Sequence, residues 1–420
     1  MEIKNLYAKF LNCDGISTDT RKIHKNSLFF ALKGANFNAN LLAEEALEKG
    51  AKYVVIDDKA YYKSNEQYIL VHDVLQTLQA LSGYHRKQLG LPIIALTGSN
   101  GKTTTKELIN VVLSQKYKTV ATEGNLNNHI GVPLTLLAMD QHTEIGIVEM
   151  GANHFNEIAF LCSIAQPDYG YITNFGKAHL EGFGSLEGVI KAKTELYQYL
   201  KNKQGIAFVQ ADDKRQLLES EQLNRIIIGK DLKAFIDTEF VALKWKDLLI
   251  QSHLTGNYNY HNLVAAIGMG SYFNVPKNQI KKAIESYIPT NQRSQIIHKK
   301  RTKILLDAYN ANPTSMKAAL DNFGKNGGHH KVVILGDMFE LGNSAEAAHL
   351  EIAKLTQSFH FESTILIGAN FYKTGLDGIQ YYKSYEDFKS GFNPKMMADK
   401  FILIKGSRGM ALERIVDLLD

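Results

Sequence analysis

Short apolar runs alternate with longer amphipathic stretches over most of the chain. From residue 91 onward the apolar, β-branched runs are IIAL (93–96), IGIV (145–148), YGYIT (169–173) and GIAFV (205–209), with enough residues between them for crossover helices. Such runs are typical of strands in a parallel sheet that has helices on both faces. A second series consists of KILLD (303–307), KVVILGD (331–337), STILIG (363–368) and KFILIKG (400–406). The pattern therefore predicts two α/β units.

The first 86 residues form a third, smaller unit, in which SLFFAL (27–32) and YVVID (53–57) flank the helical segment LLAEEALEKG (41–50). The periodicity breaks near residues 87–91 and again near the proline and polar residues of 289–294. We predict an α/β protein of three domains. These are a small N-terminal α/β domain (1–86), a central domain with a mostly parallel sheet (87–290) and a C-terminal Rossmann-like α/β domain (291–420).

Composition and charge exclude several classes of protein. A net charge of +5 over 420 residues is too small for a nucleic-acid binder. No apolar run approaches the roughly 18 residues that span a bilayer, and the first residues lack the continuous apolar core of a signal peptide. Two cysteines, Cys13 and Cys162, cannot form a disulfide framework. We expect a cytoplasmic protein with no nucleic-acid partner and no membrane insertion.

The first candidate site is the segment TGSNGKTTT (97–105), which lies between the strand IIAL and the helical segment KELINVVLSQ (106–115). Glycines allow backbone N–H groups to turn toward phosphate oxygens, and a helix N-terminus adds partial positive charge. Lys102 would contact the β- and γ-phosphates, and the Thr103 hydroxyl would bind Mg²⁺. Leu96 replaces the first glycine of the general pattern, so the match is to the shorter form Gly-x-x-Gly-Lys-Thr. The alternative is a glycine turn that caps a helix, but the strand before it and the helix after it favour phosphate binding.

Candidate acid and metal ligands follow the next strands. Glu149 ends the run IGIV, at the edge where open parallel sheets bind ligands, and a carboxylate there can hold Mg²⁺. His179 lies in GKAHLEG after YGYIT, a spacing that by itself is more typical of an ordinary loop histidine than of a ligand. Taken alone, Lys193 in AKTELY is typical of a solvated helix lysine.

Five segments, in order, resemble the Mur ligases of peptidoglycan synthesis. They are TGSNGKTTTKELI, GNLNNHIGVPLTLL, TNFGKAHLEGFGSLEGVIKAKTELY, LLDAYNANPTSM and KGSRGMALE. In the first unit, the segments 17–21 and 32–34 resemble the uridine-nucleotide region of the family, so the likeness covers all three predicted domains. Within the family, the resemblance is greatest to the branch that adds a dipeptide.

The resemblance implies an ATP-dependent amide ligase that adds D-alanyl-D-alanine to UDP-N-acetylmuramoyl-tripeptide. The substrate carboxylate is phosphorylated to an acyl phosphate, the amine attacks, and ADP and phosphate are released. By the same resemblance, the N-terminal domain binds the UDP-sugar, the central domain binds ATP and the C-terminal domain completes the ligase site. We expect the enzyme to act as a monomer.

The family also implies roles for individual residues. Thr103 and Glu149 would hold one Mg²⁺, while His179 and a carbamate on Lys193 would hold a second. The expected catalytic residues are Lys102, Glu149, His179 and Lys193. The expected ATP-binding residues are Gly98, Ser99, Asn100, Gly101, Lys102, Thr103, Thr104, Asn259, Asn262, Arg293 and Asp307. The expected substrate-binding residues are Ser17, Thr18, Lys33, Asn125, Asn127, Asn128, Asn310, Asn312, Ser407 and Arg408.

Two departures from the family pattern stand out. Tyr258 occupies the place of the histidine in the family's Gly-x-His-Asn-x-x-Asn, and Phe37–Asn40 replaces an acidic Asp-Gly-His-like stretch. The asparagine-rich segments 125–128 and 310–312 are also compatible with plain turns that begin helices, because asparagine tolerates turn geometry.

Other functions remain as alternatives. One is a Mur ligase that adds a single amino acid or an enzyme resembling folylpolyglutamate synthase, although NLNNHIGVPLTLL and DAYNANP favour the dipeptide-adding branch. Another is a scaffold protein that binds ATP without turnover. The presence of Glu149, His179 and Lys193 together argues against it, because a protein that does not turn over ATP would not need this set of residues.

Overall fold

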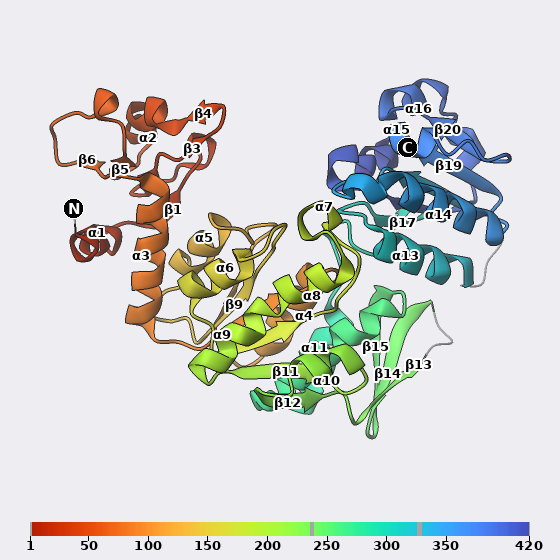
Figure 1. Ribbon diagram of the computed structural model, residues 1–420, viewed down its shortest axis with the longest axis horizontal. Helices are drawn as coiled ribbons and strands as arrows, with labels where there is room; N and C mark the ends of the chain where they lie inside the picture. The colour runs from red at the N-terminus through yellow and green to blue at the C-terminus, as the bar shows by residue number, and fades with distance from the viewer. Residues whose placement is uncertain (1, 236–238, 326–329, 420) are drawn as a thin grey trace.

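The computed structural model describes residues 2–235, 239–325 and 330–419. Three α/β units lie in a row, with the N-terminal unit at one end, the central unit in the middle and the C-terminal unit at the other end (Figure 1). The predicted fold class is confirmed. Within the described ranges, no helix combines the length and the apolar character needed to cross a membrane.

The N-terminal unit contains a parallel sheet of order β1-β2-β5-β6. Its strands and its small hairpin are β1 (Ile16–Ser17), β2 (Leu28–Phe30), β5 (Tyr53–Ile56), β6 (Tyr68–Leu70), β3 (Lys33–Gly34) and β4 (Phe37–Asn38). Its helices are α1 (Ile3–Phe10), α2 (Ala43–Glu48) and α3 (Val74–Leu89). Phe29 packs in one core cluster, while Leu28 and Phe30 pack in another. The residues of β2 are therefore all apolar because both faces of this strand are covered.

Helix α3 connects the N-terminal unit to the central one. Asp73 caps its start by accepting a hydrogen bond from the Gln76 backbone N–H, and Gly90 ends it in the left-handed conformation. Along its length α3 packs against α5 and α6 of the central unit. Arg86 is buried and donates to Asp168 Oδ2 at 2.8 Å and to the Ala165 carbonyl at 3.2 Å. The boundary predicted at 86/87 falls within this helix.

The central sheet is parallel and has the order β12-β11-β10-β7-β9-β8. Its strands are β7 (Ile93–Thr97), β8 (Thr119–Ala121), β9 (Ile145–Glu149), β10 (Tyr169–Ile172), β11 (Ile206–Gln210) and β12 (Asn224–Ile228). The apolar runs predicted β7, β9, β10 and β11. The edge strands β8 and β12 were not predicted.

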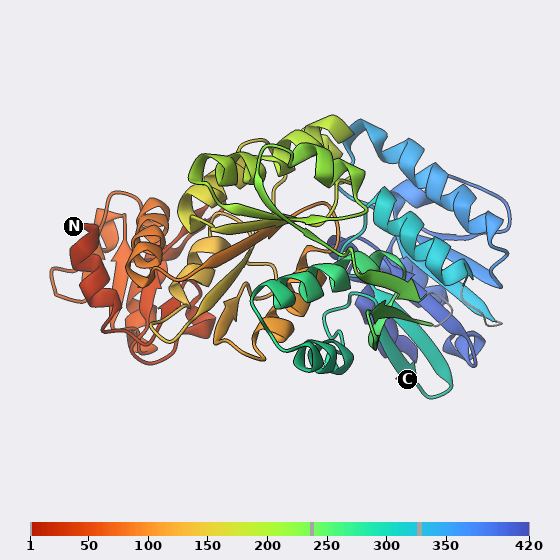
Figure 2. The same cartoon turned by 90° about the horizontal axis from the view of Figure 1, so that it is seen from below.

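Helices cover both faces of the central sheet (Figure 2). One face packs against α4 (Lys102–Leu113), α11 (Tyr258–Tyr272) and α12 (Lys277–Ser286). The other face packs against α5 (Gly131–Leu137), α6 (Glu157–Ala165), α8 (Leu186–Lys193) and α9 (Glu195–Lys203). The unit also contains α7 (Leu180–Phe183), α10 (Lys214–Glu219) and an antiparallel sheet of β13 (Leu232–Phe235), β14 (Phe240–Trp245) and β15 (Leu248–Thr255).

The C-terminal unit has a sheet of order β16-β17-β21-β18-β19-β20, in which β16 alone is antiparallel to its neighbour. Its strands are β16 (Gln295–Lys299), β17 (Thr302–Asp307), β18 (Lys331–Gly336), β19 (Ser363–Ile367), β20 (Gln380–Tyr382) and β21 (Phe401–Lys405). Its α-helices are α13 (Pro313–Lys325), α14 (Ala345–Ser358), α15 (Ala369–Tyr372) and α16 (Tyr385–Gly391). The boundary predicted at 290/291 falls between α12 and β16.

Short 3-10 helices occur in the connections of the N-terminal and C-terminal units. They are η1 (Thr20–Lys22), η2 (Ala39–Leu42), η3 (Lys59–Tyr61), η4 (Gly342–Ser344), η5 (Pro394–Met397), η6 (Arg408–Met410) and η7 (Leu412–Leu419). η4 lies against α7, so the C-terminal unit contacts the central unit at this point.

Replacing Arg86 with alanine should loosen α3 from the central unit. The substitution leaves buried carbonyl acceptors without their charged donor, and we expect the free energy of unfolding to fall by about 2–3 kcal/mol. Urea unfolding followed by circular dichroism measures the change. Lys87→Ala, at the exposed neighbouring position, is the control. Equal urea midpoints for the two variants would show that Arg86 does not stabilise the packing of α3 on the central unit.

Candidate active site

A cavity of about 1300 Å³ lies between the central and C-terminal units. Loops at the carboxyl ends of β7, β9 and β10 form one side, and loops after β17, β18 and β21 form the other. This is the edge at which parallel sheets bind ligands. The sequence-predicted residues that line the cavity are Ser99, Asn100, Gly101, Lys102, Thr103, Thr104, Asn125, Asn127, Asn128, Glu149, His179, Asn259, Asn262, Arg293, Asp307, Asn310, Asn312, Ser407 and Arg408.

The glycine loop between β7 and α4 requires glycine at two positions. Gly98 and Gly101 have φ angles of 144° and 78°. A Cβ atom at Gly98 would lie 2.0 Å from Thr173 Oγ1, and one at Gly101 would lie 2.7 Å from Asn262 Oδ1. Any other residue would therefore displace the loop and disturb the start of α4.

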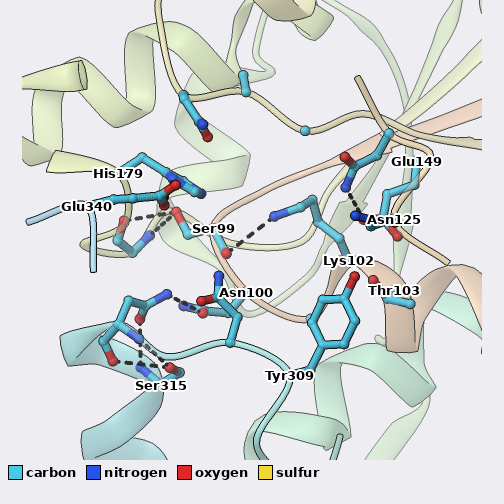
Figure 3. Close-up of a pocket in the computed structure, with 18 of the residues that line it drawn as sticks. Ser99, Asn100, Lys102, Thr103, Asn125, Glu149, His179, Tyr309, Ser315 and Glu340 are labelled. Atoms are coloured by element: carbon cyan, nitrogen blue, oxygen red, sulfur yellow. Dashed lines mark hydrogen bonds and ion pairs between the residues drawn. The ribbon is translucent and has the colours of Figure 1, made fainter. Parts of the chain in front are cut away.

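Lys102 is the first residue of α4, and its ammonium folds back over the loop that precedes it (Figure 3). Nζ donates to the Gly98 carbonyl at 2.7 Å and to the Ser99 carbonyl at 3.4 Å. Burial lowers the pKa of Lys102, and the nearby carboxylate of Glu149 opposes that shift. A partly buried ammonium at the N-terminus of a helix, lining a cavity, is an arrangement that an anionic phosphate would neutralise.

The loop after β10 holds the glycine loop in place. Thr173 Oγ1 donates to the Asn100 carbonyl at 2.6 Å, and Asn174 Nδ2 donates to the same oxygen at 2.9 Å. Ser99 Oγ exchanges hydrogen bonds with the backbone of Gly176 at 2.8 and 2.9 Å. The sequence did not identify these contacts, because they join loops that are more than 70 residues apart.

Asn259 and Asn262 form a buried chain of side-chain hydrogen bonds beneath the loop. Thr105 Oγ1 donates to Asn262 Oδ1 at 3.0 Å, and Asn262 Nδ2 donates to Asn259 Oδ1 at 2.8 Å. Asn259 Nδ2 continues to the Thr255 carbonyl at 2.7 Å. The two amides therefore tie α11 to the glycine-loop helix.

Tyr258, the departure from the family pattern, is half-buried next to these hydrogen-bonded asparagines and lines the cavity. Its hydroxyl lies 2.8 Å from Ser294 Oγ, and burial raises its pKa. Its contact with Ser294 joins α11 to the segment that leads into the C-terminal unit.

Glu149 ends β9 opposite Lys102 and has one carboxylate oxygen without a partner. Oε1 accepts a hydrogen bond from Asn127 Nδ2 at 2.8 Å. Oε2 is buried and accepts no hydrogen bond from any described residue. An unpaired buried carboxylate oxygen is costly unless a cation or a donor completes it.

The other asparagines of this segment have different surroundings. Asn128 Oδ1 accepts from the backbone N–H groups of Ile130 and Gly131, at 3.1 and 2.9 Å, so it stabilises the turn that begins α5. The plain-turn interpretation therefore also holds for Asn128. Asn125 lines the cavity near Glu149 (Figure 3).

Lys193 is fully buried, so its interpretation as a solvated helix lysine was wrong. It ends α8 and does not line the cavity, and Nζ donates to the Ala152 carbonyl at 3.2 Å. Burial, followed by the charge of Lys102, lowers the pKa of Lys193 to about 7. Its amine is therefore far more often neutral at physiological pH than that of a surface lysine.

His179 meets a carboxylate that the sequence did not identify. His179 Nδ1 lies 2.6 Å from Glu340 Oε2, and the two side chains point toward one another (Figure 3). The hydrogen bond from His179 lowers the pKa of Glu340. Glu340 follows the run KVVILGD, and the strand-end rule that identified Glu149 applies to it equally.

Tyr309, which the sequence did not identify, lines the cavity among residues that it did. The Arg293 guanidinium lies 3.9 Å from the centre of the Tyr309 ring, a cation–π contact that fixes both groups at the cavity wall. Asp307 is paired with the buried Lys405 at 2.6 Å, which compensates its charge. Asn312 Nδ2 donates to Asn100 Oδ1 at 2.7 Å, so the C-terminal unit contacts the glycine loop directly.

Three predicted substrate residues lie away from the cavity, in the N-terminal unit. Ser17 Oγ donates to the Asp19 carbonyl at 2.9 Å, and Lys33 forms an ion pair with Asp57 at 2.8 Å. Thr18 follows Ser17 at the end of β1. The structure does not bring Ser17, Thr18 or Lys33 together with the cavity residues.

Comparisons with known proteins agree with this geometry. Residues 96–270 match the Mur ligase middle domain, and residues 292–408 match the Mur ligase glutamate ligase domain. A relative in Bacillus subtilis (strain 168) named UDP-N-acetylmuramoyl-tripeptide--D-alanyl-D-alanine ligase is 35% identical over 97% of this chain and 93% of its own. The protein of the same name in Escherichia coli (strain K12) is 31% identical over 98% and 94%. A crystal structure of MurF from Acinetobacter baumannii superposes with a TM-score of 0.86 at 27% identity and covers 99% of this chain and 98% of that one.

Lys102→Ala should weaken nucleotide binding. A charge-assisted contact to phosphate contributes about 1.5–3 kcal/mol, so we expect the affinity for ATP to fall roughly 10- to 100-fold. Equilibrium binding of a fluorescent ATP analogue measures the loss. Lys177→Ala removes an exposed lysine that does not line the cavity and should bind like the parent protein. Unchanged ATP affinity in Lys102→Ala would refute the phosphate site.

Proposed function

The chain belongs to the Mur ligase family, and from that premise we propose that it joins D-alanyl-D-alanine to UDP-N-acetylmuramoyl-tripeptide at the expense of ATP. ADP and phosphate are the other products. The observation that carries the proposal is the shared cavity, in which the glycine loop of the central unit faces the strand ends of the C-terminal unit. The relatives' names, over nearly the whole chain, favour this reaction over addition of a single amino acid or of glutamate to folate. The product is a precursor of the cell wall, on which cell shape and cell division depend.

The residues of the cavity suit the two chemical steps. Lys102 and the loop amides bind the triphosphate, and its terminal phosphoryl group passes to the substrate carboxylate to give an acyl phosphate. The dipeptide amine then attacks the acyl carbon and phosphate leaves. Because Asn312 contacts Asn100 directly, the docked C-terminal unit excludes water from this intermediate. The residues assigned to the nucleoside of ATP are Asn259, Asn262, Arg293 and Asp307.

The residues present also fit Mg²⁺. Glu149 offers an unpaired carboxylate oxygen, and the Thr103 hydroxyl lies in the first turn of α4. The described residues contain no cluster of three or more His, Cys, Asp or Glu side chains that could hold an ion, which suits an ion bound mainly by phosphate oxygens. When bound, Mg²⁺ neutralises charge that develops on the transferred phosphoryl group. His179 would hold a second ion.

Lys193 fits carbamate formation. Only a neutral amine attacks CO₂, and burial gives Lys193 a pKa of about 7. The amine nitrogen forms a bond to carbon and loses a proton, which converts a cation into an anionic oxygen ligand. Such a group suits the vicinity of Mg²⁺ and Lys102, where an ammonium would be repelled.

The remaining assignments follow the three units. Ser17, Thr18 and Lys33 would contact the UDP-sugar in the N-terminal unit, and Asn125, Asn127 and Asn128 would face the reacting end of the peptide. The residues assigned to the incoming dipeptide are Asn310, Asn312, Ser407 and Arg408. We expect the enzyme to act as a monomer. A UDP-linked substrate supports a cytoplasmic location.

The direct test is formation of ADP by the purified protein. We expect ADP and phosphate to appear only when ATP, UDP-N-acetylmuramoyl-tripeptide and D-alanyl-D-alanine are all present. A coupled assay for ADP, with the product identified by mass spectrometry, measures the reaction. Activity with single amino acids but not with the dipeptide would reject the proposal in favour of the alternative ligases.

Carbamate formation has a test of its own. After incubation with ¹³C-bicarbonate, we expect a carbamate carbonyl signal in the ¹³C NMR spectrum of the protein that is absent from Lys193→Ala, together with loss of most ligase activity in that variant. Lys191→Ala, at an exposed position on the same helix, should keep both signal and activity. A variant lacking Lys193 with full activity would show that the lysine has no part in the reaction.

A further inference from the structure

The pair formed by His179 and Glu340 joins two units at the rim of the cavity. His179 immediately precedes α7 of the central unit, and Glu340 lies between β18 and η4 of the C-terminal unit. Both residues have left-handed backbone conformations, with φ angles of 51° and 61°. Such conformations are unfavourable for residues other than glycine and concentrate at functional sites. The chain thus accepts backbone strain on both sides of this one contact.

Three hydrogen bonds hold Glu340 and the two residues before it in place. The Met338 N–H donates to His349 Nε2 at 3.0 Å, and the Phe339 N–H donates to Ser407 Oγ at 2.9 Å. Across the interface, the Glu181 N–H donates to the Glu340 carbonyl at 3.3 Å. The carboxylate is therefore presented to His179 by a fixed backbone.

The same pair contributes little to the docking of the two units. The Glu340 side chain is 48% exposed, and ion pairs this open to water are weak. Other contacts join the units without it, including the bond between Asn312 and Asn100 and the bond from the Lys177 N–H to Thr314 Oγ1 at 3.1 Å. The effect of Glu340 falls instead on the imidazole, which is only 17% exposed.

We propose that Glu340 is a positioning residue: its carboxylate, 2.6 Å from His179 Nδ1, keeps the ring proton on that nitrogen and leaves Nε2 as the ring nitrogen whose lone pair binds a divalent cation. Histidines that bind metals generally donate their other N–H to such a partner, which fixes both tautomer and ring orientation. The inference rests on the function proposed above. It adds that this ligand is oriented only while the C-terminal unit is docked, so docking and completion of the cation site occur together.

The test measures binding of Mn²⁺, in place of Mg²⁺, to the full chain with a non-hydrolysable ATP analogue, by electron paramagnetic resonance. His179→Ala defines the binding that depends on the imidazole. In Glu340→Ala we expect the affinity of that same binding to fall about 10- to 100-fold. Glu340→Gln keeps an oxygen that accepts the Nδ1 proton and should restore most of the affinity. Glu346→Ala, at an exposed carboxylate that does not line the cavity, should bind like the parent protein.

Two further measurements separate positioning from docking. In the His179→Ala background, Glu340→Ala should cause no additional loss, because it acts through the histidine. Small-angle X-ray scattering should give the same radius of gyration for Glu340→Ala and the parent protein. An expanded particle would make Glu340 a docking contact and overturn the proposal, as would unchanged Mn²⁺ affinity in Glu340→Ala or in His179→Ala. If instead the parent protein forms no ADP with both substrates while Mn²⁺ binding still depends on Glu340, the proposed reaction fails and the positioning role stands.

Discussion

The contact between Asn100 and Asn312 holds the two walls of the cavity together, because it joins the glycine loop of one unit to a strand-end loop of the other. Each unit alone would present its strand ends to water. When the two edges face each other, Lys102, Glu149, His179 and Glu340 surround one space. Glu149 and His179 are largely shielded from water there, and charges in such surroundings interact more strongly than at an open surface.

The glycine loop is rigid because its surroundings leave it no alternative conformation. Thr173 fills the volume that a side chain at position 98 would need, and Asn262 does the same at position 101. Polar groups beneath and behind the loop are satisfied by one another, as in the chain from Thr105 through Asn262 to Asn259. Glu149, which lines the cavity, keeps one carboxylate oxygen without a protein partner. Ligand binding then completes a set of interactions that the protein has prepared.

The sequence was informative where local pattern dictates structure. The strand before Gly98 and the helix that begins at Lys102 followed from apolar runs and glycine spacing, and Glu149 followed from its place at a strand end. Strand β15 was missed because it alternates buried and exposed positions over much of its length, whereas continuous apolar runs were the signal used. The sequence could not predict the environment of Lys193 or the partners of Asn100 and His179. They depend on packing between segments that are far apart in the chain, and residue spacing gives no information on such contacts.

Helix α3 has a consequence for the size of molecule that the protein can accept. Its 16 residues extend about 24 Å, and Arg86 anchors its far end to the start of β10. The first sheet is thus mounted on a stiff rod rather than on a flexible tether. A molecule gripped there at one end must have the right span to present its other end at the glycine loop. The fixed distance between the first sheet and the glycine loop therefore selects molecules by their length, in addition to any recognition of chemical groups by side chains.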